Sequence, residues 1–245
     1  MLKACLNGAR DARLSPAVPV TPEGLAREAA ASVEAGAHAL HLHPRGPDGL
    51  ESLAVTDVAA ALSAVRAACP GVPVGISSGY WMLPDVAAQL EAAHAYATLA
   101  ASERPDFVSV NVHEPHAPAL AELLLNAGIG VEVGVWSLEA LAVFRIWPQR
   151  TRVLRVLMEL PDEPQDVALP LAHDLLRGLE GVASSVPTLL HGQGRSAWPV
   201  LTLAGQLGLS TRIGLEDTLR LPGGTPAPGN AARVSAARAV LASVR

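Results

Sequence analysis

The chain contains little lysine and little cysteine, and each shortage excludes a class of protein. Lys3 is the only lysine, beside seventeen arginines. A Schiff-base aldolase or a pyridoxal-phosphate enzyme needs a lysine buried in its barrel, whereas we expect Lys3 at the outer start of the first strand. On that expectation both classes are excluded. Cys5 and Cys69 are too few for a disulfide framework or a cysteine zinc site, so we expect them in apolar packing.

The sequence also has no basic stripe, no signal peptide and no membrane-spanning run. The formal charge of −5 and the absence of interleaved basic and aromatic residues argue against a nucleic-acid partner. Residues 1–4 lead into a strand-like stretch without a charged segment followed by a long apolar one. The longest uncharged run, residues 67–84, contains three prolines and three glycines and cannot form a spanning helix. We therefore expect a soluble, cytoplasmic protein.

Short strand-like runs alternate eight times with amphipathic runs rich in alanine and leucine. The expected strands are residues 2–7, 37–43, 72–77, 107–111, 130–135, 152–158, 187–191 and 211–214. The expected helices are residues 22–35, 55–69, 83–93, 117–126, 138–147, 166–179, 198–207 and 230–244. Alternating strands and helices pair in parallel, and eight units close a barrel. The pattern predicts a single-domain (β/α)8 TIM barrel over residues 1–245. An open doubly wound sheet is the alternative, but residues 7–10 lack its usual glycine-rich loop.

Catalytic groups in such barrels lie at the C-terminal ends of the strands, and polar residues gather at these positions. They are Asn7, Arg10, His41, His43, Arg45, Ser77, Ser78, Ser109, Asn111, His113, Glu114, Glu132, Glu159, His191, Arg212, Glu216 and Asp217. We therefore expect a functional site on this rim of the barrel.

The clearest chemical motif is His41-Leu42-His43, at the end of the second expected strand. Residues i and i+2 of a strand point to the same face and lie roughly 6.6 Å apart at the backbone. Two imidazoles placed in this way can bind one metal ion at about 2.0–2.1 Å from each nitrogen. The alternative is a pair of buried histidines, which would need two separate sets of hydrogen-bond partners. The position at a strand end favours the metal site.

Two adjacent carboxylates, Glu216 and Asp217, follow the eighth expected strand. Their side chains would point in different directions, so one could be a third metal ligand and the other a base. A solvated turn, in which Asp217 caps a short helix at Thr218, is the alternative. Arg212 lies four residues before Glu216, where its guanidinium could bind a substrate carboxylate through two hydrogen bonds.

Other polar positions give weaker indications. Ser77 and Ser109 could donate hydrogen bonds to a carboxylate, although serine at a strand end is often part of a turn. Glu132 is a lone charge in a central strand, which is costly unless it is paired. Residues 192–195, Gly-Gln-Gly-Arg, could present backbone N–H groups to a phosphate, although a lone Gly-X-Gly is a weak signal.

Several of these motifs together resemble one enzyme family, nearly from end to end. They are Asn7-Gly8-Ala9, Glu34-Ala35-Gly36-Ala37, His41-Leu42-His43-Pro44-Arg45, Ile76-Ser77-Ser78-Gly79, Ser109-Val110-Asn111, Val131-Glu132-Val133, Gly192-Gln193-Gly194-Arg195 and Arg212-Ile213-Gly214-Leu215-Glu216-Asp217. The chain resembles the β-keto acid cleavage enzyme family, which includes 3-keto-5-aminohexanoate cleavage enzyme.

The resemblance implies a zinc-dependent barrel that converts a β-keto acid and acetyl-CoA into acetoacetate and a new acyl-CoA. It implies one zinc ion held by His41, His43 and Glu216, with open positions for the substrate. It further implies Asp217 as the base, and a homo-oligomer is expected. Arg212 and Ser77 are implied as the groups that bind the carboxylate and the developing charge. The other expected contacts are Ser109, Asn111, Glu132 and Arg10 for the substrate, and Gly192, Gly194 and Arg195 for acetyl-CoA.

Arg10 departs from the pattern of 3-keto-5-aminohexanoate cleavage enzyme, which has a glutamate after the Gly-Ala of the first strand. An arginine there would repel an ammonium-bearing substrate. Arg10 could pair with Glu132 and leave a small neutral pocket, or it could face the substrate and favour an anionic or polar group. We expect Arg10 to pair with Glu132, because burying the charge of Glu132 without a partner would destabilise the fold.

Two other functions are compatible with a His-X-His motif on a barrel. A metal-dependent amidohydrolase carries this motif on its first strand and further metal histidines on strands five and six. Here the motif follows a complete strand–helix unit, the fifth strand offers Glu132, and the sixth offers no histidine. A degenerate barrel with a structural metal is the non-enzymatic alternative.

Overall fold

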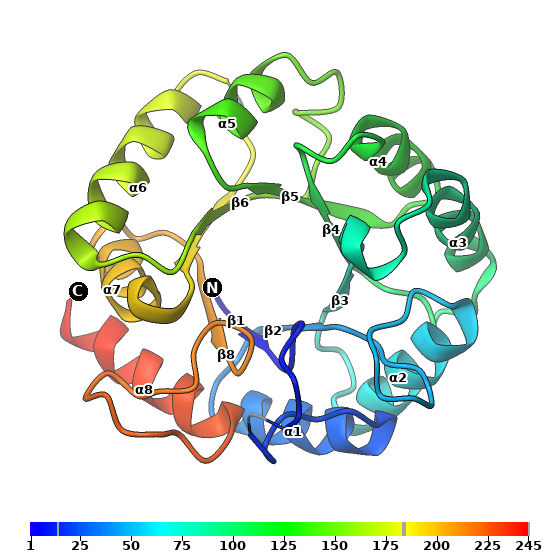
Figure 1. Cartoon of the computed structure of the whole chain (residues 1–245), viewed down its shortest axis with the longest axis horizontal. Coiled ribbons are helices and arrows are strands. Elements are labelled where there is room, and N and C mark those ends of the chain that lie inside the picture. Colours follow the sequence, from blue (N-terminus) through cyan, green and yellow to red (C-terminus); the bar gives the residue numbers. More distant parts are fainter. Residues whose placement is uncertain (14, 183–184, 245) are drawn as a thin grey trace.

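Eight parallel strands form a ring at the centre of the protein, and helices surround the ring (Figure 1). The computed structural model describes residues 1–13, 15–182 and 185–244. The strands are hydrogen-bonded in the order β7-β6-β5-β4-β3-β2-β1-β8, with each neighbouring pair parallel. A parallel bridge between Leu189 and Ser210 brings the start of β7 beside the start of β8. The predicted (β/α)8 TIM barrel is therefore confirmed.

Strands and helices alternate along the chain as this fold requires. The strands are β1 (Leu2–Cys5), β2 (Ala39–Leu42), β3 (Val74–Ser77), β4 (Phe107–Asn111), β5 (Gly130–Val135), β6 (Arg155–Leu160), β7 (Thr188–Gly192) and β8 (Thr211–Gly214). The helices are α1 (Pro22–Glu34), α2 (Val55–Ala68), α3 (Val86–Thr98), α4 (Ala117–Asn126), α5 (Leu138–Arg145), α6 (Gln165–Leu179), α7 (Ala197–Gln206) and α8 (Asn230–Ser243). Short 3-10 turns, η1 (Tyr80–Met82) and η2 (Gly194–Ser196), follow β3 and β7.

The expected elements agree with the observed ones in type and order, and differ at some ends. The fourth, fifth and eighth strands and the fourth helix have the expected bounds. The third helix begins at Val86 rather than residue 83, because the Asp85 side chain caps it by accepting a hydrogen bond from Ala88 N at 3.0 Å. Strand β6 begins later than expected, because residues 149–152 form a turn.

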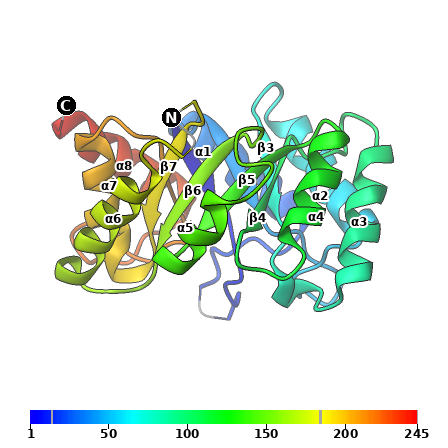
Figure 2. The ribbon, with the colours of Figure 1, turned by 90° about the horizontal axis from the view of Figure 1, so that it is seen from above.

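The apolar core lies between the outer face of the sheet and the inner faces of the helices. Leu40 and Leu42 of β2 are fully buried in it, as the alternation around His41 predicts, together with Leu25 of α1 and Leu62 of α2. In the side view of Figure 2, β5 and β6 run obliquely between the helices, which is the strand tilt of a closed barrel. Within the described part of the chain, no helix combines the length and the apolar character needed to cross a membrane.

The part of the barrel interior near the N-terminal ends of the strands contains charged side chains. Lys3, Phe107, Glu132 and Arg155 form a cluster, which we call the lower layer, near the N-terminal ends of their strands. The ammonium of Lys3 binds Glu132 Oε1, and Nε of Arg155 lies 3.0 Å from Glu132 Oε2. The Phe107 ring lies 5.5 Å from Lys3 Nζ and 5.0 Å from the Arg155 guanidinium carbon.

The expectation that Lys3 lies at the outer start of the first strand is wrong. Its side chain is fully buried inside the barrel, because Glu132 neutralises its charge there. An ion-paired ammonium is not a nucleophile, and Lys3 does not border the cavity described below. This pairing is therefore the reason against a Schiff-base role. Cys5 and Cys69 are both buried and free, as predicted.

Candidate active site

A cavity of about 510 Å³ opens at the C-terminal ends of the strands. Its wall is formed by residues of β2, β3, β4, β6 and β8 and of the loops that follow β1, β2, β3, β5, β6, β7 and β8. The lining residues are Ala9, Arg10, His41, His43, Ser77, Trp81, Ser109, Asn111, Trp136, Leu157, Glu159, Asp162, Gln193, Gly194, Arg212 and Glu216. The rim that the sequence marks as polar therefore does surround a cavity.

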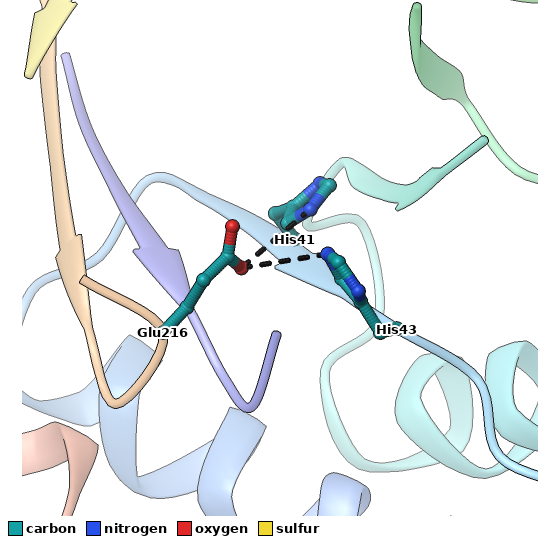
Figure 3. A group of neighbouring side chains, drawn as sticks. All are labelled: His41, His43 and Glu216. Carbon is teal, nitrogen blue, oxygen red and sulfur yellow. Dashed lines mark ion pairs between the residues drawn. The ribbon is translucent and has the colours of Figure 1, made fainter. Parts of the chain in front are cut away.

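His41, His43 and Glu216 converge at this cavity (Figure 3). Nε2 of His41 lies 3.6 Å from Glu216 Oε2, and Nε2 of His43 lies 3.8 Å from the same oxygen. These separations are too long for hydrogen bonds and close to the roughly 3.4 Å edge of a zinc tetrahedron with bonds of about 2.1 Å. One potential ligand atom from each residue lies within 4.8 Å of the others. The three side chains therefore fit one divalent ion.

The electrostatics of these three residues also suit a metal ligand set. Burial lowers the pKa of His41 well below its usual value, which keeps its imidazole neutral. Burial opposes ionisation of Glu216, but Arg212, His41 and His43 outweigh it and lower the pKa of this carboxyl. Glu216 Oε2 has no hydrogen-bond partner among the described residues. Imidazole nitrogens and a carboxylate with a free oxygen form a donor set that zinc accepts.

The loop after β1 holds two of these ligands in place. The Asn7 side chain accepts a hydrogen bond from His43 N at 2.9 Å and donates one to His43 O at 2.8 Å. Gly8 has φ +57°, and a Cβ atom there would lie 2.3 Å from Cγ of Glu216. The Asn7-Gly8 pair therefore fixes the backbone of His43 and leaves room for Glu216.

Behind His41 and His43, Arg212 holds both acidic residues of the β8 loop. Its Nη2 lies 2.7 Å from Glu216 Oε1 and 2.9 Å from Asp217 Oδ1, and its Nε donates to Asp217 at 3.0 Å. Burial opposes ionisation of Asp217, but Arg212 and His191 outweigh it and lower its pKa. Asp217 is fully buried and does not line the cavity, whereas Arg212 does. The role of Asp217 as the base stays a prediction.

Glu159, near the C-terminal end of β6, also borders the cavity. Its Oε2 lies 3.3 Å from His191 Nε2, and the Gln193 amide donates to Oε1. Burial opposes ionisation, but His191, Arg212 and Gln193 lower the pKa of Glu159 to about 2. Burial and Arg212 act against a charge on His191, yet Glu159 and Asp217 raise its pKa overall. Glu159 is thus an ionised carboxylate that lines the cavity and is fixed by His191 and Gln193.

The prediction that Arg10 pairs with Glu132 is wrong. Glu132 lies in the lower layer with Lys3 and Arg155, and does not border the cavity. Arg10 instead donates from Nε to the carbonyls of Leu215 and Glu216, both at 3.2 Å, and lines the cavity. Backbone carbonyls of the β8 loop satisfy this guanidinium, and within the described residues no carboxylate forms an ion pair with it.

Of the remaining residues predicted to contact the substrate, three line the cavity and one, Glu132, does not. Ser77, Ser109 and Asn111 line the cavity. Ser77 Oγ accepts a hydrogen bond from Gly79 N at 3.2 Å and keeps its hydroxyl hydrogen for another partner. Ser109 donates to Glu132 at 3.1 Å, so Glu132 acts on the cavity only through this serine.

The loop at residues 192–195 does not offer free backbone N–H groups to a phosphate. Gly194 N donates to Asp217 O at 2.7 Å, and Arg195 N donates to Asp162 at 2.9 Å. A Cβ at Gly192 would lie 2.3 Å from Ser196 Oγ, so this glycine serves close packing. Of the three residues predicted for acetyl-CoA, Gly194 borders the cavity, whereas Gly192 and Arg195 do not. Their role stays a prediction.

Trp81, Trp136 and Asp162 line the cavity although no sequence motif marks them. Glu159, predicted only as a rim residue, and Gln193, predicted only as part of the 192–195 loop, also line it. Glu159 carried a usable signal, because it ends the sixth strand and points to the rim. The others lie in loops after strand ends, where no periodicity fixes the side-chain direction.

Comparisons with known proteins find relatives in sequence and, separately, in fold. It is 25% identical over 222 residues to 3-keto-5-aminohexanoate cleavage enzyme of Fusobacterium nucleatum, covering 88% of this chain and 81% of that one. It is 26% identical over 244 residues to 3-oxoadipate:acetyl-CoA acetyltransferase of Cupriavidus necator, covering 91% and 81%.

A solved structure of ObcA with oxaloacetate superposes with a TM-score of 0.78 at 19% identity, a likeness of fold alone. The match covers 94% of this chain but only 64% of ObcA. The family model of beta-keto acid cleavage enzymes matches residues 1–245. The chain therefore belongs to the β-keto acid cleavage enzyme family.

Proposed function

We propose that this protein converts a β-keto acid and acetyl-CoA into acetoacetate and a new acyl-CoA, and that it uses one divalent metal ion, zinc, to do so. The observation that carries the proposal is the set of three ligand atoms of His41, His43 and Glu216 on the wall of the cavity beside Arg212. Membership of the family and the names of the two relatives support it.

The metal would supply polarisation of the substrate ketone, which makes the neighbouring CH2 group acidic. The protein's own residues would hold the substrate. Arg212 borders the cavity, and the described residues give its Nη1 no hydrogen bond, so this N–H group can bind the substrate carboxylate. The Ser77 hydroxyl can donate to the developing charge from the same wall.

We assign Asp217 as the base that removes the proton from the CH2 group. It is an ionised carboxylate, held by Arg212 and His191, one residue after a metal ligand. Because it lies behind the cavity wall, the transfer would run through one water molecule, which general base catalysis permits. The Arg212–Asp217 pair, rather than Asp217 alone, is then the catalytic unit.

The rest of the reaction balances without a further reactant. The deprotonated carbon attacks the acetyl thioester, so that a C–C bond forms and the C–S bond breaks. The released CoA thiolate then attacks the original ketone, the older C–C bond breaks, and acetoacetate leaves after its carbon regains the proton. The far part of the keto acid leaves as the new acyl-CoA.

Arg10 sets an expectation for the substrate. Its guanidinium lines the cavity without a carboxylate partner among the described residues, so the neutral-pocket version loses its basis. We propose that the far end of the substrate is polar or anionic, and that an ammonium there is disfavoured. One relative is named for 3-oxoadipate, whose far end is a carboxylate.

The test is a screen of β-keto acids with the purified protein, with free acetoacetate and new acyl-CoA as readouts. We expect acetoacetate to form only when acetyl-CoA and a divalent metal are both present. Acetate and a free carboxylic acid formed from the keto acid without acetyl-CoA would indicate a hydrolase. Bound metal without any product across the panel would instead favour a structural site.

A further inference from the structure

A carboxylate in the loop after β2, Glu51, joins the proposed metal ligands to the wall of the cavity. Its Oε1 atom lies 2.5 Å from Nδ1 of His43. Its Oε2 atom accepts a hydrogen bond from Nε1 of Trp81 at 3.2 Å. One oxygen therefore serves a metal ligand, and the other serves a residue that borders the cavity.

The contact with Glu51 decides which nitrogen of His43 is free to bind a metal. A neutral imidazole carries one N–H group, and a carboxylate at Nδ1 fixes that group on Nδ1. The lone pair of Nε2 is then directed toward Glu216, whose Oε2 lies 3.8 Å away. Metal-binding histidines commonly donate their second nitrogen to a carboxylate in this way. Nδ1 of His41, by contrast, has no partner among the described residues.

Trp81 is placed so that it can respond to this contact. It lies in η1, its ring centroid is 6.5 Å from that of His43, and it is 48% exposed. A Cβ atom at Gly79 would lie 2.2 Å from the indole ring, so the ring folds over this glycine. The backbone of η1 is fixed by Tyr80 N, which donates to Glu114 at 2.9 Å.

We infer that Glu51 is the positioning residue of His43 and that it couples Trp81 to occupancy of the metal site. A cation on Nε2 makes Nδ1–H a stronger donor to Glu51, and this changes the carboxylate that Trp81 contacts. The inference rests on the proposed function, because it requires a metal at His41, His43 and Glu216. Its tests measure metal affinity and tryptophan emission, which do not depend on turnover.

The first test is the zinc affinity of metal-free protein, measured by competition with a chelator for wild type, Glu51→Gln and Glu91→Gln. Glu51→Gln keeps the size of the side chain but weakens the acceptor, so we expect an affinity loss of about 10- to 100-fold. Glu91 is an exposed carboxylate on α3. Glu91→Gln removes the same charge as Glu51→Gln at a site away from His43, so its zinc affinity should stay within about two-fold of wild type.

The second test is the change of tryptophan emission on adding zinc. The protein has four tryptophans, so the difference between wild type and Trp81→Phe isolates the signal of Trp81. We expect zinc to change this signal in wild type and to leave it unchanged in zinc-saturated Glu51→Gln. Trp81→Phe itself should lose less than about ten-fold in zinc affinity, because Glu51 still holds His43.

The outcomes separate the inference from the proposed function. Wild-type zinc affinity in Glu51→Gln, or an emission of Trp81 that zinc does not change, overturns the inference and leaves the metal site standing. A wild-type protein that does not bind zinc overturns both. Thermal unfolding of Glu51→Gln near the wild-type temperature shows that any loss of affinity is local.

Discussion

The lower layer and the rim of the barrel both contain buried charged side chains, but they differ in how these charges are satisfied. In the lower layer, Glu132 is bound by Lys3 and Arg155, and none of these residues borders the cavity. At the rim, Glu216 borders the cavity, and its Oε2 atom has no hydrogen-bond partner among the described residues and lies 3.6 and 3.8 Å from the nitrogens of His41 and His43. Buried charge alone therefore does not mark a site in this barrel. A carboxylate oxygen left without a close partner beside a cavity does.

The largest expected effect is loss of the metal from the rim. His41→Ala and His43→Ala each remove one of three ligands, so both variants should lose most of about one zinc-class ion per chain. Elemental analysis of the purified proteins measures this. Lys3→Met, which changes only the lower layer, is the control and should keep the metal. Full metal content in both histidine variants would refute the assignment of the site.

The next effect is on stability, and it belongs to the lower layer. Lys3→Met leaves Glu132 fully buried with Arg155 as its remaining partner, so we expect a loss of about 3–5 kcal/mol in the free energy of unfolding. Denaturant unfolding gives the value. The double variant Lys3→Met with Glu132→Gln should recover part of the loss. If Lys3→Met is as stable as wild type, the pairing does not stabilise the barrel.

A smaller effect separates the two carboxylates of the β8 loop. Asp217→Asn keeps the shape of the side chain and removes its basicity, so metal content should stay intact while turnover falls by about 10²-fold or more. Metal analysis and steady-state kinetics on the same preparation decide the matter. Loss of metal at near-normal activity would show that the roles of Glu216 and Asp217 are reversed or absent.

The smallest effect concerns Arg10 and the charge of the substrate. An ammonium near this guanidinium should lower kcat/KM by several-fold to about a hundredfold relative to an uncharged keto acid of similar length. The measurement compares 3-keto-5-aminohexanoate with such an uncharged acid, in wild type and in Arg10→Gln. A wild-type preference for the aminated acid would contradict this role of Arg10 and leave the metal chemistry untouched.

The sequence predicts the barrel and the common face of His41 and His43 because both follow from local periodicity. The choice of Glu216 rather than Asp217 as the third proposed ligand rests on the family resemblance. Strand alternation puts His41 and His43 on one face, and the end of β8 puts Glu216 on the same rim. The depth of Lys3 and the partners of Arg10 depend on strand register and on loop carbonyls, which no local pattern encodes. Glu51 lies eight residues after His43, in a loop whose path only the fold determines.

The central claim is that the acetyl group of acetyl-CoA becomes part of acetoacetate, and isotope labelling tests it most directly. Acetyl-CoA labelled with ¹³C at the acetyl carbonyl is incubated with an accepted β-keto acid and the metal-loaded protein. The account predicts that the label appears at the ketone carbon of acetoacetate and is absent from the new acyl-CoA. Unlabelled acetate, with the label retained in acetyl-CoA, would show that the keto acid is hydrolysed and would contradict the account.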